Sequence, residues 1–215
     1  MDPSHGRRYS KRDIEVAACD ILKKQYPTTL SRPIDIDRIV YNHGGVDDIR
    51  PIPLLEDRFR VAAVLYVKEN GKADILVDED TLDFQHARAS FSIAHEFGHI
   101  VLHKEVWSRC KTIEDSLTLH QRINRSYKFI EGAANRFAGA ILVPVSLLSK
   151  DIQDIYAGLV KIYGFDGDLI CHKMYSDLAK GYGVSPETMR IRISVLDLQK
   201  KIELALRYKL QYLEP

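Results

Sequence analysis

The residues best suited to chemistry lie in the pentapeptide HEFGH, where His95 and His99 are four positions apart and Glu96 lies between them. On an α-helix, residues four apart share a face, so both imidazoles can point toward one metal ion. Two histidines leave room for a third protein ligand and a water molecule, which is the arrangement of a catalytic zinc site. Glu96 is then the candidate general base that takes a proton from that water.

The alternative is that His95 and His99 are core histidines satisfied by ordinary hydrogen bonds. The flanking residues, 92–94 and 100–102, are uncharged, which is not typical of a helix face exposed to solvent. Burying two imidazoles and a carboxylate is costly unless each finds a partner. One metal ion meets that requirement for all three, and we therefore favour the metal site.

A third ligand must come from another element, and Glu131 is the only acidic residue of a helix predicted at 124–142. Asn135 lies four positions later, where its side chain can accept a hydrogen bond from the second nitrogen of a ligand histidine. Glu131 could instead be a solvated carboxylate that favours the positive end of the helix dipole. The spacing to Asn135 favours Glu131 as the ligand.

His103 is the other candidate near the site. It lies eight residues after His95, about 12 Å along a helix axis at about 1.5 Å per residue, which is too far for one shared ion. We expect His103 to support a ligand from outside the coordination sphere or to line the cleft, and a plain packing role fits equally well. Four side chains are near enough in sequence to be considered as oxyanion stabilisers: His120, Arg122, Arg125 and Tyr127.

Helical and extended patterns place this motif in an α+β chain. Ser10 precedes a first amphipathic helix that ends before Pro27, and a shorter helix is predicted from about Pro33 to the Gly44-Gly45 pair. Residues 61–77 predict a hairpin with Asn70-Gly71 as a two-residue turn. A long helix from about 82 to 103 then carries the HEFGH motif.

The second half of the chain is predicted to be helical. A polar, weakly periodic segment at 104–122 is longer than most connections inside a domain, which favours a place along a cleft. Further helices follow at 124–142, which Pro144 stops, at 146–163, and from the Gly-rich turn at 163–167 to the end of the chain. We predict two domains, 1–145 and a helical extension, 146–215, packed on it.

Composition argues against several classes of protein. The 215 residues are 45% hydrophobic, enough for a core, and 31 basic residues balance 30 acidic ones, so no global field favours nucleic acid or an anionic membrane. The three cysteines show no CxxC spacing, which favours reduced thiols. Because the N-terminus lacks an apolar signal segment and the longest apolar run is broken by Pro144, we expect a cytoplasmic protein.

Three ordered blocks of the sequence resemble the ImmA/IrrE family of bacterial and phage zinc metallopeptidases. They are RASFSIAHEFGHIVLH, EGAANRFAGAILVP and LAKGYGVSPETMRIRISVL, and the resemblance extends to the leading helix, the PIDIDRIV segment and the hairpin. It implies a zincin-like fold with a gluzincin-like Zn²⁺ site in which His95, His99 and Glu131 are ligands and Glu96 is the base. Members often carry a second glutamate two positions after the first, and Ala133 stands there in this chain.

The resemblance also implies a partner, because many members are similar to regulators that cleave a helix-turn-helix repressor. The expected function is therefore a site-specific zinc metalloendopeptidase acting on such a repressor, with roles in transcription regulation and stress response. The alternative is a non-catalytic zinc-containing regulator that binds a protein or DNA. Glu96 argues against it, because a structural zinc site is expected to close its fourth position with a protein ligand.

Residues 178–196 have the form of a helix, a Gly-Val-Ser turn and a second helix, which resembles a helix-turn-helix. Arg190 and Arg192 would be few phosphate contacts beside the six or more of a typical DNA-binding protein. We therefore favour packing on the core, or docking of the substrate repressor, over DNA binding. Most of the apolar side chains of this segment, among them Ile191, are expected in the core.

Overall fold

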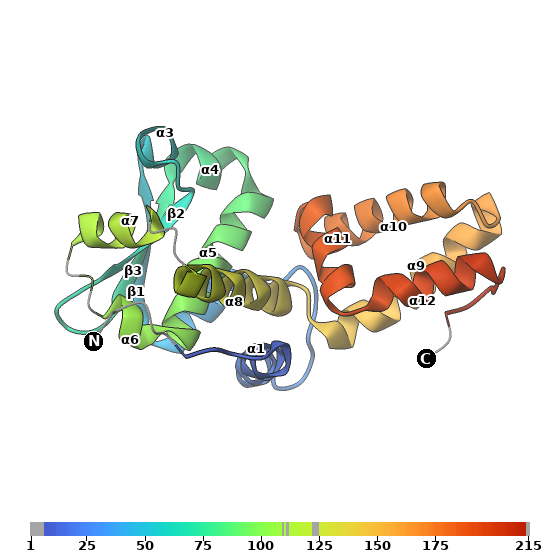
Figure 1. Cartoon of the computed structure of the whole chain (residues 1–215), viewed down its shortest axis with the longest axis horizontal. Helices are drawn as coiled ribbons and strands as arrows, with labels where there is room; N and C mark the ends of the chain where they lie inside the picture. Colours follow the sequence, from blue (N-terminus) through green and yellow to red (C-terminus); the bar gives the residue numbers. More distant parts are fainter. Residues whose placement is uncertain (1–6, 109, 111, 122–124, 214–215) are drawn as a thin grey trace. The chain divides into compact units, whose positions relative to one another are not determined.

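The computed structural model describes residues 7–108, 110, 112–121 and 125–213, with only the backbone at 120, 121 and 125–127. The chain divides into two compact units. The N-terminal unit contains residues 1–31 and 35–142, and the C-terminal unit contains residues 32–34 and 143–215. Figure 1 shows that the sheet belongs to the first unit, whereas the second is helical. The α+β prediction is confirmed: a mostly helical chain carries one small mixed sheet.

The two leading helices begin at side-chain caps. α1 (Lys11–Gln25) has Ser10 at its N-cap, where Ser10 and Asp13 form a capping box that satisfies two backbone amides. α2 (Ile36–His43) begins after Asp35, whose carboxylate accepts from Arg38 N–H, and it ends at Gly44 in the left-handed region. The prediction of a start near Pro33 was therefore wrong by a few residues, because Asp35 supplies the cap.

Three strands form the sheet in the order β1-β3-β2. β1 (Val46–Ile52) runs parallel to β3 (Ala73–Asp78), and β2 (Ala63–Val67) runs antiparallel to it. The predicted hairpin is confirmed, but its turn is not the two-residue one: Lys68 pairs with Lys72 across a three-residue loop in which Gly71 has φ +79°. β1 was not predicted, because VDDIRPI is too polar to show a strand pattern.

The two faces of the sheet are covered differently (Figure 1). Val64 and Leu76 share an apolar cluster with Leu55, from α3 (Leu55–Phe59), and with Leu117, from α7 (Ile113–Gln121). The helix that carries the HEFGH motif packs on the opposite face. Side chains alternate between the faces of a strand, so neighbouring residues of β2 contact α7 and this helix in turn.

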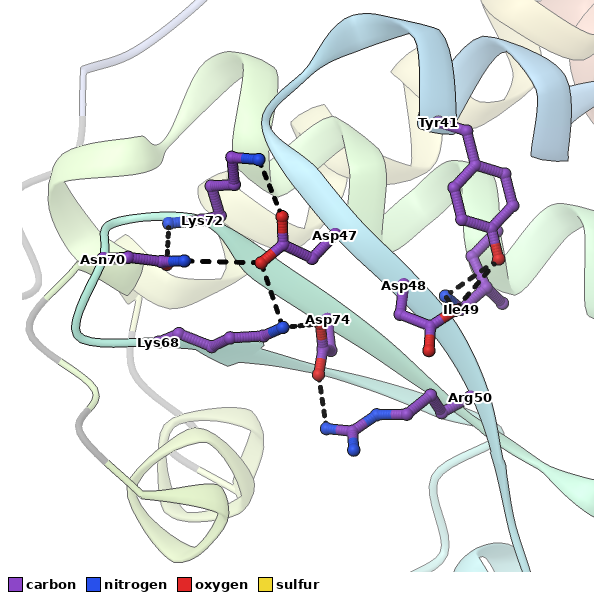
Figure 2. Close-up of polar contacts among 9 residues, drawn as sticks. All are labelled: Tyr41, Asp47, Asp48, Ile49, Arg50, Lys68, Asn70, Lys72 and Asp74. Carbon is purple, nitrogen blue, oxygen red and sulfur yellow. Dashed lines mark hydrogen bonds and ion pairs between the residues drawn. The ribbon is translucent and has the colours of Figure 1, made fainter.

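Ion pairs join β1 and β3 to the loop between β2 and β3 (Figure 2). The Asp74 side chain is 2% exposed and pairs with Lys68 Nζ at 2.7 Å and with Arg50. Asp47 binds Lys68 and Lys72, at 3.0 and 2.8 Å, and their hydrogen bonds lower the pKa of Asp47 to about 2. Because each of these charges has a partner of opposite sign, we infer that the cluster stabilises the sheet.

The predicted helix from 82 to 103 is two helices, which corrects the sequence analysis. α4 (Glu79–Phe84) is capped by Asp78, and α5 (His86–Leu102) follows after a break at Gln85, where φ is −128° and ψ is 55°. The segment after α5 is also more ordered than a loop. It contains α6 (Lys104–Trp107) and α7, which bury Val106, Trp107 and Leu117.

α8 (Arg125–Leu142) completes the N-terminal unit and packs along α5. The C-terminal unit consists of α9 (Val145–Tyr163), α10 (Gly167–Tyr182), α11 (Pro186–Val195) and α12 (Leu198–Arg207). Within the described residues no single helix is long and apolar enough to cross a membrane, although Lys128–Leu142 and Val145–Tyr163 meet that test of length and composition as a bent pair.

The segment 32–34 belongs to the C-terminal unit although it precedes α2 in the chain. Arg32 Nε donates to Asp151 Oδ2 at 2.6 Å, and the Tyr182 hydroxyl donates to the same oxygen at 2.7 Å. This carboxylate therefore ties an early segment of the chain to α9 and α10. Nothing in the sequence predicted the tie, because its members are far apart along the chain.

Candidate metal centre

α5 carries the HEFGH motif and packs against α8. His99 is fully buried, Glu96 is 2% exposed, and the His95 side chain is 13% exposed. Both imidazoles point their Nε2 atoms to the same place, 3.1 Å apart. Helical spacing alone brings these two nitrogens together, as the sequence predicted.

α8 contributes Glu131, whose carboxylate oxygens lie 3.2 Å from His95 Nε2 and 3.1 Å from His99 Nε2. One ligand atom from each of the three residues fits within a group 4.8 Å across. Around zinc, ligand atoms about 2.0–2.1 Å from the ion in a tetrahedron would be about 3.3–3.4 Å from one another. The distance between the two Nε2 atoms, and the distance from each of them to its nearer Glu131 oxygen, are close to that value, so this donor set suits zinc.

Gly98 allows α5 and α8 to approach closely enough for this contact. A Cβ at Gly98 would lie 3.0 Å from a ring carbon of Phe137 and 3.3 Å from the Ala134 Cα. Side chains at this crossing are therefore excluded on the α5 side. Because Ala134 lies one turn after Glu131, the glycine inside HEFGH determines how near the carboxylate comes to the two histidines.

Asn135 binds His95 from outside the cluster. Its Oδ1 lies 2.9 Å from His95 Nδ1, on the opposite side of the ring from Nε2. If Nδ1 carries the proton, it donates to Asn135 and leaves the Nε2 lone pair free to bind a metal. This contact fixes the orientation of the ring.

The charges of Glu131 and His99 are those that metal ligands need, whereas burial lowers the pKa of His95 but is outweighed by its hydrogen bond with Glu131, which raises it. Burial by itself raises the pKa of Glu131, but hydrogen bonds with His95 and His99 outweigh burial and hold this pKa well below its ordinary range. Burial lowers the pKa of His99 to about 4, so its imidazole is neutral near pH 7. A carboxylate and a neutral imidazole are the ligating forms of these side chains.

Glu96 lies beside the edge of the sheet, at β2. Burial raises its pKa to about 8, while a hydrogen bond with the backbone of Leu65 in β2 acts in the opposite direction. Glu96 and His95 also line a cleft together with the start of β2 and with Phe91. The carboxylate therefore lies beside the cluster, at the place where a substrate could enter.

Two aromatic rings, those of His103 and Trp107, lie next to His99. The His103 ring lies 5.6 Å from the His99 ring and 5.7 Å from the Tyr9 ring, and among the described residues neither of its nitrogens has a hydrogen-bond partner. Its contact with the ligand is thus a ring contact. Trp107, which the sequence analysis missed, packs its ring 4.7 Å from that of His99. The only feature of the sequence that could have singled out Trp107 is that the chain has one tryptophan.

The side chains considered as oxyanion stabilisers lie outside the described residues: His120, Arg122, Arg125 and Tyr127. They stay candidates from the sequence. The polar segment predicted to line a cleft does so in part, because Lys104, Trp107 and Ser108 border a second cavity of about 260 Å³ behind α5.

The arginines of the helix-turn-helix-like segment are both engaged within the protein. Arg192 is 3% exposed, and its Nε donates to the Val143 carbonyl oxygen at 3.0 Å. Arg190 forms a two-point contact with Glu187 on the exposed side of α11, at 2.6 and 2.9 Å. Ile191, expected in the core, is 49% exposed because it shares that outward face.

Comparison with known proteins gives one match. The family model Peptidase_M78, described as the IrrE N-terminal-like domain, matches residues 68–194. The match begins inside the β2–β3 hairpin, contains α5 and α8, and ends in α11. No curated protein matches the chain.

Proposed function

The chain belongs to the ImmA/IrrE family of metallopeptidases, and on that premise we propose that it is a zinc-dependent, site-specific protease that cleaves a helix-turn-helix repressor. One observation carries the chemical part: His95, His99 and Glu131 converge from two helices beside Glu96, at the wall of a cleft. The donor set supports zinc because imidazole and carboxylate ligands are typical of catalytic zinc sites.

Each protein group has a separate task in peptide hydrolysis. Zinc, when bound, would supply a Lewis acid that polarises a carbonyl group and lowers the pKa of water. Glu96, in its ionised form, takes up the proton of the attacking water and transfers it to the nitrogen of the leaving amine. Asn135 holds the His95 ring in place, and the Leu65 backbone does the same for Glu96.

The repressor substrate is supported by the family rather than by the site. Many ImmA/IrrE members are similar to regulators that release repression by proteolysis, and this chain carries the metal-site motifs of that family. The alternative, DNA binding by 178–196, receives no support from the arginines, because Arg190 pairs with Glu187 and Arg192 is buried.

The test begins with the genes beside that of this protein, where we expect a helix-turn-helix repressor, and uses that repressor as the substrate. We expect the zinc-loaded protein to cut that repressor into two fragments, and Glu96→Gln to retain zinc but to lose cleavage by a factor of at least about 10². Electrophoresis measures cleavage, and elemental analysis measures zinc. Glu69→Gln, an exposed carboxylate of the hairpin loop, is the matched control and should cleave normally. Normal cleavage by Glu96→Gln would contradict the mechanism.

A further inference from the structure

The cavity of about 260 Å³ behind α5 is separate from the cleft beside Glu96. Its lining comes from α2, the three-stranded sheet, the hairpin loop, α5 and α6, and we call it the Trp107 cavity. None of its lining residues belongs to that cleft or to the metal cluster. A cavity of about 150 Å³ can hold benzene, so by volume this one accommodates about ten non-hydrogen atoms.

The walls of the Trp107 cavity are hydrocarbon. Leu65, Ala73 and Trp107 are buried, from β2, β3 and α6 respectively. Val67 and Ile100, which are partly buried, complete the apolar lining. Such walls favour an apolar group, and the indole ring favours an aromatic one, because paired rings gain stabilisation beyond the area that they bury.

The polar side chains of the lining are exposed, and none of them is acidic. They are His43, Asn70, Lys104 and Ser108. Lys104 forms no ion pair within the part of the chain that the structure describes. Burial lowers the pKa of His43, and the charges of Lys24 and Lys104 lower it further, so this imidazole is neutral near pH 7. The positive charge of the lining is therefore that of Lys104.

The Asp47 carboxylate does not cancel this charge. It accepts a hydrogen bond from Asn70 Nδ2 at 3.4 Å, beside the cavity (Figure 2). It is already paired with Lys68 and Lys72, at 3.0 and 2.8 Å. A ligand with a carboxylate of its own would complement Lys104, whereas a cationic ligand would meet a like charge.

Two walls of the Trp107 cavity also contact residues of the metal site. The Trp107 ring lies 4.7 Å from the His99 ring, and the Leu65 backbone is hydrogen-bonded to Glu96. A ligand packed against Trp107 restrains a ring that also packs against a candidate zinc ligand. Two ligands that order the same group favour each other's binding, and by linkage they do so by the same factor.

We propose that the Trp107 cavity is an effector site for a small aromatic carboxylate of about ten non-hydrogen atoms. The aromatic ring packs against Trp107 and the apolar side chains of the sheet, and the carboxylate pairs with Lys104. Binding of this acid and binding of zinc strengthen each other through Trp107. None of this requires that a substrate be cleaved.

Trp107 reports occupancy directly, because it is the one tryptophan of the chain. Its fluorescence is followed on the zinc-loaded protein during titration with phenylacetate or phenylacetamide, which have the same size and differ in charge. We expect a saturable change, with phenylacetate binding at least about threefold more tightly, as for an ion pair with an exposed lysine. Lys104→Gln should remove this difference. Lys161→Gln, an exposed lysine of α9, is the matched control and should keep it.

A second variant tests the location of the site. Val67→Phe fills the cavity from a partly buried position of β2 and should weaken both probes by at least about tenfold, with unchanged zinc content. Acetohydroxamate, which binds zinc, should not displace phenylacetate. Displacement by acetohydroxamate, equal affinities for the two probes, or no saturable change in fluorescence would overturn the site.

The effector role is tested by linkage. Phenylacetate should bind at least about threefold more tightly to the zinc-loaded protein than to protein treated with chelator, and it should raise the affinity for zinc by the same factor. Calorimetric titration measures both affinities. Equal affinity for phenylacetate with and without zinc would overturn the coupling through Trp107.

Discussion

The two units differ in whether their buried polar side chains are paired with other groups of the protein. In the N-terminal unit, His95, His99 and Glu131 direct three potential ligand atoms at one point. In the C-terminal unit, Arg192 is aimed at a main-chain carbonyl oxygen, and Asp151 receives hydrogen bonds from two side chains. The second pattern is complete within the protein, whereas the first has the form of a site that binds something else.

This difference separates function from architecture. Buried polar groups are costly unless they are paired, so a fold keeps them where they stabilise a contact or where chemistry needs them. Arg192 and Asp151 fall in the first class and the HEFGH cluster in the second. Four substitutions distinguish these classes, because loss of a ligand should change metal binding and loss of a structural contact should change stability alone.

The largest effect is expected from Glu131→Gln, which keeps the shape of the side chain and removes its charge. Metal affinity should fall by more than about 100-fold, beyond the 10–100-fold typical of changes outside the coordination sphere, for which Asn135→Ala is the comparison. Zinc at about 100 times Kd should stabilise the wild type by about 2.7 kcal/mol and the variant hardly at all. Thermal unfolding with and without chelator measures both. Equal stabilisation by zinc would show that Glu131 is not a ligand.

Arg192→Ala should destabilise the protein by about 2–4 kcal/mol without affecting metal binding. The change leaves a cavity and removes the hydrogen bond to the Val143 carbonyl oxygen. Arg190→Ala, on the exposed face of the same helix, is the matched control and should unfold with the wild type. Urea unfolding measures the free energy of unfolding of each. If the two variants were equally stable, the structural role of Arg192 would be wrong.

Gly98→Ala should lower both the stability of the protein and its affinity for zinc, because Gly98 lies where α5 and α8 meet. The added methyl group would contact Phe137 and the Ala134 backbone, and overpacking of this kind typically costs about 1–3 kcal/mol. The helices must separate, which moves Glu131 away from the histidines and should weaken zinc binding. Calorimetric titration with zinc measures the second effect. Gly158→Ala, which meets no atom within 4 Å, is the control. Unchanged zinc affinity in Gly98→Ala would contradict the dependence on helix approach.

The smallest effect concerns Asp151. Burial raises the pKa of this carboxyl group, but hydrogen bonds from Arg32 and Tyr182 outweigh burial and lower it below 3.8. A lowered folded-state pKa contributes stability that is present above pH 3.8 and is lost as the pH falls through the folded value. Asp151→Asn should therefore cost about 1 kcal/mol at pH 7, and the difference from wild type should shrink toward pH 3. A difference that is independent of pH would exclude this contribution.

Local patterns predicted the elements that carry the site. Ser10 indicated the start of α1, the 61–77 pattern indicated the hairpin, and the spacing of HEFGH placed two imidazoles on one helix face. Each of these signals acts over a few residues, where backbone geometry dictates the outcome. Glu131 and Asn135 followed from the same spacing rule on a second helix.

Other features depend on contacts between distant segments and gave weaker signals. β1 is recognisable only through its pairing with β3, and its polar residues have partners that the sequence does not connect to them. Asp47 and Arg50 pair with charged residues of β3 and of the loop before it, and Asp48 accepts a hydrogen bond from Tyr41 of α2. The break at Gln85 falls inside the stretch from 82 to 103, where the helical pattern of apolar residues shows no gap. The Trp107 ring reaches His99 from a separate short helix, which no periodicity connects to α5.

The sequence by itself determined the candidate site of this protein: the two histidines, the proposed general base and the glutamate are given by residue type and by a spacing of four along helices. Only the tertiary structure decided how these groups meet. Gly98 sets the distance between α5 and α8, and the β2 edge places Leu65 beside Glu96. The physical reason is that helical periodicity fixes direction within one element, whereas the separation between elements depends on how all their side chains pack.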